Sequence, residues 1–167
     1  MRTLSRLLAA TAALSGPSIA AGIVVAQEAP EQLCDTLAAN PLDDTRKAPG
    51  VETADIKGEP ARAACQDAIA RFPEEARFQF QLARALRALN LNEDAVFWYR
   101  KSAERGYAGA QNSLGVMYMQ GLGVKADCGE AVRWYAKAAA QGYEPAKRNL
   151  ESAPCLSRAD ARWVFPA

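Results

Sequence analysis

Apolar residues in the second half of the chain recur with the spacing of amphipathic helices. One run falls at positions i, i+3, i+4, i+7 and i+8, and its members are Ala131, Trp134, Tyr135, Ala138 and Ala139. This spacing places them on one face of a helix. Asp127 stands at the N-cap position with Glu130 three residues later, as in a capping box. Gly142 supplies the left-handed residue that ends many helices, so the pattern predicts a helix between Asp127 and Gly142.

The same pattern occurs earlier in the chain, so the sequence contains a repeat. Residues 95–99 return as 131–135 after 36 positions, and 10 of the 20 residues that start at Ala95 match their counterparts. A second helix is predicted to begin near Ala108, with Ala110, Leu114, Gly115 and Tyr118 on one face. Gly115 allows a neighbouring helix to approach closely. Each repeat is therefore predicted to be an antiparallel helix hairpin.

Further helices of the same kind are predicted on both sides of this unit. Residues 77–86 form a first helix in which Leu82 takes the place of Leu114. Residues 61–72 have the pattern of the second helix of a preceding hairpin, because Pro73 follows and ends it. Residues 144–152 begin a partial unit at the other end. The chain thus contains between two and three helix hairpins.

A known family pattern is matched almost completely by residues 110–143, which read AQNSLGVMYMQGLGVKADCGEAVRWYAKAAAQGY. This stretch resembles the Sel1-like repeat, a branch of the tetratricopeptide superfamily, because its glycines, aromatic residues and alanines fall at the offsets of that repeat. The resemblance implies an all-α fold: a short right-handed α-solenoid of two to three antiparallel helix hairpins with an N-terminal loop-rich cap. We therefore expect a cap segment at 27–58, the repeat domain at 59–154 and a C-terminal cap or tail at 155–167.

The N-terminus has the composition of a signal peptide, predicted at residues 1–26. Arg2 and Arg6 form a basic start, an uncharged apolar run follows, and Val24 and Ala26 place small residues before a cleavage point. The same run is just long enough for an uncleaved membrane anchor, which is the alternative. Cleavage of a Sec-type signal after Ala26 predicts a protein of the periplasm, or a secreted one, without stable membrane insertion.

Composition then excludes several classes of function. The 167 residues include 20 Lys+Arg, 19 Asp+Glu and no histidine. A net charge of +1 gives no basis for nucleic-acid binding. Without histidine there is no His-based triad and almost no type of catalytic zinc site, so we predict no metal, no cofactor and no catalytic residue. Recurring aromatic residues are assigned to the core: Trp98, Tyr99, Trp134 and Tyr135. Acidic residues in first helical turns are assigned to capping: Glu93, Asp94, Asp127 and Glu130.

Four cysteines follow the signal peptide, and an even number in an exported chain predicts disulfides. No two are close enough in sequence to form a CxxC metal site. Three pairings exist, and the hairpin geometry selects one of them. Cys128 starts one helix and Cys155 follows the end of its antiparallel partner, so these two are predicted to pair. Cys34 then pairs with Cys65 and ties the N-terminal segment to the first repeat helix.

The resemblance also implies a peptide-binding groove. In tetratricopeptide-like arrays the groove is lined by first-helix residues at fixed distances from a conserved leucine. Carried over to Leu82, Leu114 and Leu150, this rule selects Phe80, Arg84, Arg87, Asn112, Val116, Met119, Arg148 and Ser152, and Arg77 lies one turn before Phe80. Such a lining suits an extended or acidic segment of another protein. The alternative is that the arginines form a solvated helix face. On the groove interpretation, Arg84→Glu weakens partner binding without lowering the melting temperature.

The family implies a non-catalytic exported adaptor that binds another protein. The alternative function is a cell-wall-binding or β-lactam-hydrolysing envelope protein, with peptidoglycan as the partner, because a cysteine-rich branch of the Sel1-like family has been linked to those activities. That branch carries closely spaced cysteine pairs, whereas the pairs predicted here are 27 and 31 positions apart. At the C-terminus, Trp163, Val164 and Phe165 are expected either to cover the open end of the array or to form an exposed contact site.

Overall fold

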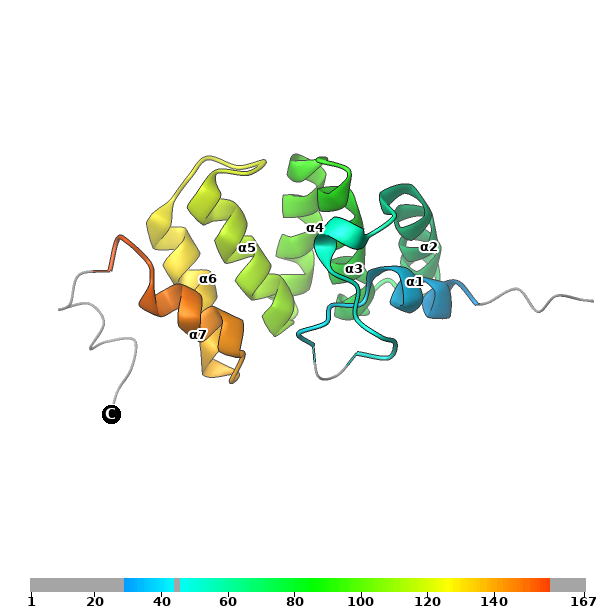
Figure 1. Ribbon diagram of the computed structural model, residues 1–167, viewed down its shortest axis with the longest axis horizontal. Helices are drawn as coiled ribbons and strands as arrows, with labels where there is room; N and C mark the ends of the chain where they lie inside the picture. The colour runs from blue at the N-terminus through cyan, green and yellow to red at the C-terminus, as the bar shows by residue number, and fades with distance from the viewer. Residues whose placement is uncertain (1–28, 44–45, 157–167) are drawn as a thin grey trace, which may run out of the picture.

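The computed structural model describes residues 29–43 and 46–156, and all regular structure in these ranges is helical (Figure 1). In chain order the elements are α1 (Pro30–Ala38), η1 (Thr53–Asp55, a 3-10 helix), α2 (Gly58–Arg71), α3 (Ala76–Ala88), α4 (Asn92–Glu104), α5 (Ala108–Gln120), α6 (Cys128–Ala140) and α7 (Glu144–Glu151). The predicted signal peptide and the segment with Trp163, Val164 and Phe165 lie outside the described residues. None of the described helices is long and apolar enough to cross a membrane.

Each α-helix packs against the next one along the chain, which gives the stacked arrangement of a solenoid (Figure 1). The most extensive contacts are those within the pairs α3–α4 and α5–α6, the two hairpins that the repeat predicts. α1 pairs with α2 before them, and α7 packs on α6 after them. In such arrays each unit buries its apolar face only against its neighbours. The predicted all-α solenoid of helix hairpins is therefore confirmed.

The N-terminal segment contains a helix that the sequence pattern did not indicate. α1 has Pro30 in its first turn, where backbone N–H groups have no acceptor within the helix, so the missing N–H of proline costs no helical hydrogen bond. The helix buries Cys34, Asp35 and Ala38. It packs against both α2 and α3. The rest of the segment, over the described residues 39–43 and 46–57, is loop apart from η1. The cap is thus a helix followed by a loop, and both lie against the first hairpins.

Two repeat-related glycines end their helices as predicted. Gly106 follows α4 with a φ of 88°, and Gly142 follows α6 with a φ of 83°. Side chains with a Cβ rarely adopt this left-handed conformation, so glycine is favoured at both turns. Asn90, with a φ of 61°, takes the corresponding place after α3. Asparagine is among the few other residues that tolerate this region.

Of the two reciprocal hydrogen bonds of the predicted capping box at the start of α6, the one accepted by the Asp127 side chain is present. Asp127 accepts a hydrogen bond from the backbone N–H of Glu130 at 2.9 Å. The Glu130 carboxylate pairs with Arg133 one turn later. One of the free N–H groups at the start of α6 is therefore satisfied by the Asp127 side chain, as the sequence indicates.

Three of the four recurring aromatic residues belong to the core of the array, as predicted. Tyr99, Trp134 and Tyr135 are buried, whereas Trp98 is half-buried and packs against the core. Tyr99 lies against Phe80 of the preceding helix, with ring centroids 5.8 Å apart. These side chains fill the space between hairpins, so their recurrence reflects packing.

α5 and α6 approach each other closely at Gly115. A Cβ at this position would lie 2.6 Å from Cε1 of Tyr135 and 3.0 Å from the carbonyl oxygen of Ala131. We expect Gly115→Ala to lower the free energy of unfolding by about 1–3 kcal/mol, because the added methyl group overpacks this contact. Urea denaturation followed by circular dichroism measures the change. Gly129→Ala, at an exposed helical position, is the control; equal stability of the two variants would contradict the prediction.

Two disulfides connect helices at opposite ends of the array. Cys34 of α1 and Cys65 of α2 are paired with their Cα atoms 4.7 Å apart, and both residues are fully buried. Cys128, the first residue of α6, is paired with Cys155 beyond α7, at a Cα separation of 6.1 Å. This second disulfide lies at the surface. The pairs are the same two that the hairpin geometry indicates.

Candidate functional site

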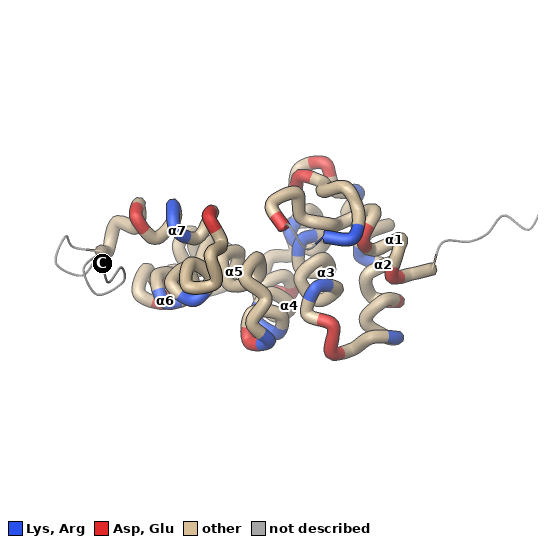
Figure 2. The backbone as a smooth tube through the Cα atoms, turned by 90° about the horizontal axis from the view of Figure 1, so that it is seen from below, with Lys and Arg blue, Asp and Glu red and all other residues tan. Residues whose placement is uncertain are grey.

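The N-terminal segment lies across α3, on the side where the predicted groove begins (Figure 2). Arg84 of α3 is the centre of this contact, and only 4% of it is exposed. Its guanidinium donates hydrogen bonds to the carbonyl oxygens of Ala38, at 2.8 Å, and Val51, and to the Thr53 hydroxyl at 3.3 Å. Burial lowers the pKa of Arg84 below its usual value. Arg84 therefore holds the N-terminal segment of its own chain.

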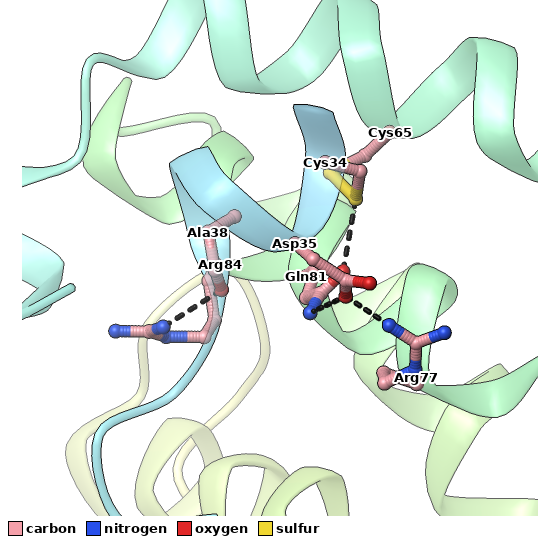
Figure 3. The surroundings of a disulfide bond; sticks show 7 residues. All are labelled: Cys34, Asp35, Ala38, Cys65, Arg77, Gln81 and Arg84. Atoms are coloured by element: carbon pink, nitrogen blue, oxygen red, sulfur yellow. Dashed lines mark hydrogen bonds and ion pairs between the residues drawn. A yellow bond between two sulfur atoms is a disulfide. The ribbon is translucent and has the colours of Figure 1, made fainter. Parts of the chain in front are cut away.

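A second polar cluster joins α1 to the beginning of α3 (Figure 3). Arg77 forms an ion pair with the buried carboxylate of Asp35, and Gln81 donates its amide N–H to the same carboxylate at 2.9 Å. The other amide atom, Oε1 of Gln81, lies 2.9 Å from Cys34 Sγ. That contact is not a hydrogen bond, because a disulfide sulfur carries no proton. The acidic partner of Arg77 is thus supplied by α1.

The described residues 39–43 and 46–51, which we call the N-terminal loop, have their two ends close together. The backbone N–H of Val51 donates to the carbonyl oxygen of Ala39 at 2.8 Å. At Gly50 a Cβ would lie 2.1 Å from Cα of Pro41, so the two arms of the loop touch there. Compact loops with joined ends are a recurrent surface structure. Arg84 binds at this closure, since its acceptor Ala38 directly precedes the loop and its acceptor Val51 is the last residue of the loop.

The N-terminal loop also reaches the turns that precede α5 and α7. The Tyr107 hydroxyl donates to the carboxylate of Asp43, and the Asn40 amide donates to the Tyr143 hydroxyl at 3.1 Å. Burial raises the pKa of Tyr143. Tyr107 and Tyr143 are equivalent positions of the repeat, so one loop contacts the same residue of two successive units.

Three of the four expected lining residues of α3 make contacts within the chain itself. Phe80 is 1% exposed and packs between Tyr99 and Tyr107, so it belongs to the core. Arg77 and Arg84 are bound to the N-terminal segment. The physical reason is that the chain itself fills the first part of the groove, which buries Phe80 and Arg84 and pairs the partly exposed Arg77 with Asp35.

The lining residues of α5 and α7 are more accessible. Asn112 is half-buried and accepts a hydrogen bond from Asn149 at 2.8 Å, and Val116 and Met119 are half-buried. Ser152 is exposed, and its hydroxyl donates to the Arg148 carbonyl oxygen at 2.9 Å. Among the described residues neither Arg148, which is exposed, nor the half-buried Arg87 of α3 forms an ion pair. Of the arginines predicted to line the groove, these two have no ion-pair partner among the described residues.

A pocket of about 530 Å³ lies where the N-terminal loop meets the two turns. It is lined by Leu42, Asp43, Gly106, Tyr107, Ala108, Gly109, Gln141, Gly142, Tyr143, Glu144, Pro145 and Arg148. Of these only Arg148 was selected from the sequence. The recurrence of the Gly-Tyr pairs 106–107 and 142–143 is visible in the sequence. It indicates a turn, because of the glycine, but it does not indicate a binding role for the tyrosine.

Comparison with protein families addresses the repeat directly. Residues 79–107 and 108–143 each match the Sel1 repeat. The chain contains two Sel1 repeats. No curated protein and no solved structure matches it. The first matched repeat covers α3 from Gln79 and α4, and the second covers α5 and α6. α1, α2, the N-terminal loop and α7 lie outside the matched repeats, so one wall of the pocket is an addition to the repeat array.

Proposed function

We propose that this protein is a non-catalytic adaptor of an exported compartment and binds an extended acidic segment of another protein. Sel1 repeats generally mediate protein–protein interaction. The observation that carries the finer proposal is the exposed Arg148, which has no ion-pair partner in the described residues and stands at a pocket beside α5. An unpaired guanidinium on a binding face favours a carboxylate.

The contacts of the N-terminal segment support this choice of partner. Where the groove is filled, its arginines bind carbonyl oxygens and a carboxylate, as Arg84 and Arg77 do. The segment that supplies these acceptors is partly extended and carries acidic residues. A partner segment of similar chemistry would find Arg148 and Arg87 along the same face.

The proposed compartment rests on the cysteines. Disulfides persist in oxidising environments such as the periplasm, and both cysteine pairs of this chain are formed. A small array of this kind gains much from such links, since each closes a loop in the unfolded chain and contributes roughly 3–4 kcal/mol on the chain-entropy estimate. Export through the predicted signal peptide is part of the proposal.

Affinity capture from a cell-envelope fraction, followed by quantitative mass spectrometry, tests the proposed function. We expect Arg148→Glu to lower the recovery of specific partners at least fivefold, because it reverses the charge that the partner's carboxylate meets. Arg133→Glu is the matched control, since the Arg133 side chain is 71% exposed on α6. Equal recovery with both variants would contradict the proposal. Hydrolysis of nitrocefin by the purified protein would instead favour the β-lactam-hydrolysing alternative.

A further inference from the structure

The pocket beside the N-terminal loop is assembled from three segments that are distant in sequence. The loop contributes Leu42 and Asp43, the turn before α5 contributes Tyr107, and the turn before α7 contributes Tyr143, while Arg148 comes from α7 itself. Its volume of about 530 Å³ lies in the range of binding pockets and exceeds the space that one side chain needs. The site therefore exists only when the loop lies against the repeats.

The charges around the pocket leave one cation available. The carboxylate of Asp43 accepts the Tyr107 hydroxyl, and Glu144 pairs with Lys147 at 2.5 Å. Arg148 has no ion pair within the part of the chain that the structure describes. Both α5 and α7 also begin at the pocket, and the positive ends of their dipoles add to the guanidinium charge. Arg148 is therefore the cation at this pocket that has no ion-pair partner in the described residues, and its guanidinium suits one acidic side chain.

Leu42 supplies an exposed apolar side chain to the pocket. This side chain is 59% exposed, more than any other exposed large apolar residue of the described chain. It is nevertheless fixed in place, because its backbone N–H donates to the Asn40 side chain at 3.2 Å while Asn40 itself donates to Tyr143. A leucine held at the mouth of a pocket offers apolar area to a ligand without a large loss of loop entropy.

From these observations we infer that the pocket is a composite docking site for an extended peptide whose acidic side chain meets Arg148 and whose neighbouring apolar side chain covers Leu42. The inference rests on the proposed function and adds the sequence character of the partner. It also gives the N-terminal loop a role in recognition, since Leu42, which would contact the apolar side chain of the peptide, lies outside the matched Sel1 repeats.

Peptide titrations observed by NMR test this inference. The probes are capped octapeptides with one Glu and one Leu at spacings of one to four residues in a Gly-Ser background; a matched set has Lys in place of Glu. We expect the Glu peptides, and not the Lys peptides, to shift the backbone amide signals of Gly106, Gly109 and Gly142, which line the pocket. Leu42→Ser and Arg148→Gln should each weaken the affinity about fivefold or more.

Two control variants separate the site from general surface effects. Leu33→Ser changes an exposed leucine of α1, and Arg133→Gln changes an exposed arginine of α6; neither residue lines the pocket. Both should bind the Glu peptides as the unchanged protein does. Loss of binding in Arg148→Gln but not in Leu42→Ser would overturn the composite site and leave the proposed function standing. Glu peptides that shift none of the pocket glycines would overturn the inference, whatever envelope capture shows.

Discussion

Replacement of Arg84 by methionine is expected to lower the free energy of unfolding by about 3 kcal/mol. The methionine keeps much of the side-chain volume but leaves the carbonyl oxygens of Ala38 and Val51 without their donor. A buried polar group that loses its partner costs about 1–3 kcal/mol. Urea denaturation measures the change, and amide hydrogen exchange at Val51, whose N–H bonds to Ala39, should become faster than in the unchanged protein.

Arg87→Met is the matched control for this prediction. Arg87 lies one turn further along α3, is half-buried, and makes no hydrogen bond or ion pair through its side chain within the described residues. We expect it to change stability by less than about 1 kcal/mol. If both variants unfold at the same urea concentration, Arg84 does not hold the loop. The expectation drawn from the sequence, that Arg84→Glu leaves the melting temperature unchanged, is replaced by a large loss of stability.

Removal of the Cys34–Cys65 disulfide is expected to cost about 4 kcal/mol. Chain entropy accounts for most of this, because the bond closes a loop of 31 positions in the unfolded chain. Loss of packing adds to it, since both residues are fully buried between α1 and α2. The double variant Cys34→Ala/Cys65→Ala, followed by thermal denaturation and by hydrogen exchange in α1, measures both effects.

The second disulfide provides the comparison. Cys128–Cys155 closes a loop of 27 positions, so its entropic contribution is similar, but it lies at the surface beyond α7. Cys128→Ala/Cys155→Ala should lower stability less and leave the exchange rates of α1 unchanged. Faster exchange in α1 after loss of this distant disulfide would show that the two ends of the array unfold together.

The hairpins could be predicted from the sequence because each of their determinants is local. Ala95 and Ala131 begin matching helices, Gly106 and Gly142 end them, and Gly115 marks a close approach. Each residue acts within its own unit or on its immediate neighbour, and the repetition shows which positions matter. Prediction of α2 to α7 therefore needed no long-range information.

The candidate site could be predicted only in part, because its formation depends on contacts between distant segments. The groove rule selected Arg84 and Arg148 alike, since both occupy lining positions of first helices. Their different environments are set by Ala38 and Val51, which no period relates to α3. Leu42 had no local signal at all, since a leucine in a Pro- and Asp-rich segment gives no indication of the turns that it will meet.

The hydrogen bond between Asn40 and Tyr143 has a consequence for the order in which the molecule is assembled. The two residues are 103 positions apart, whereas most contacts of a solenoid join neighbouring units and can form as the chain leaves the ribosome. Cys34 and Cys65 can meet early in synthesis, after only the first two helices have emerged. The loop that follows Cys34 acquires its last partner only when the turn before α7 has been made. One of the first segments to be synthesised is thus among the last to reach its final position.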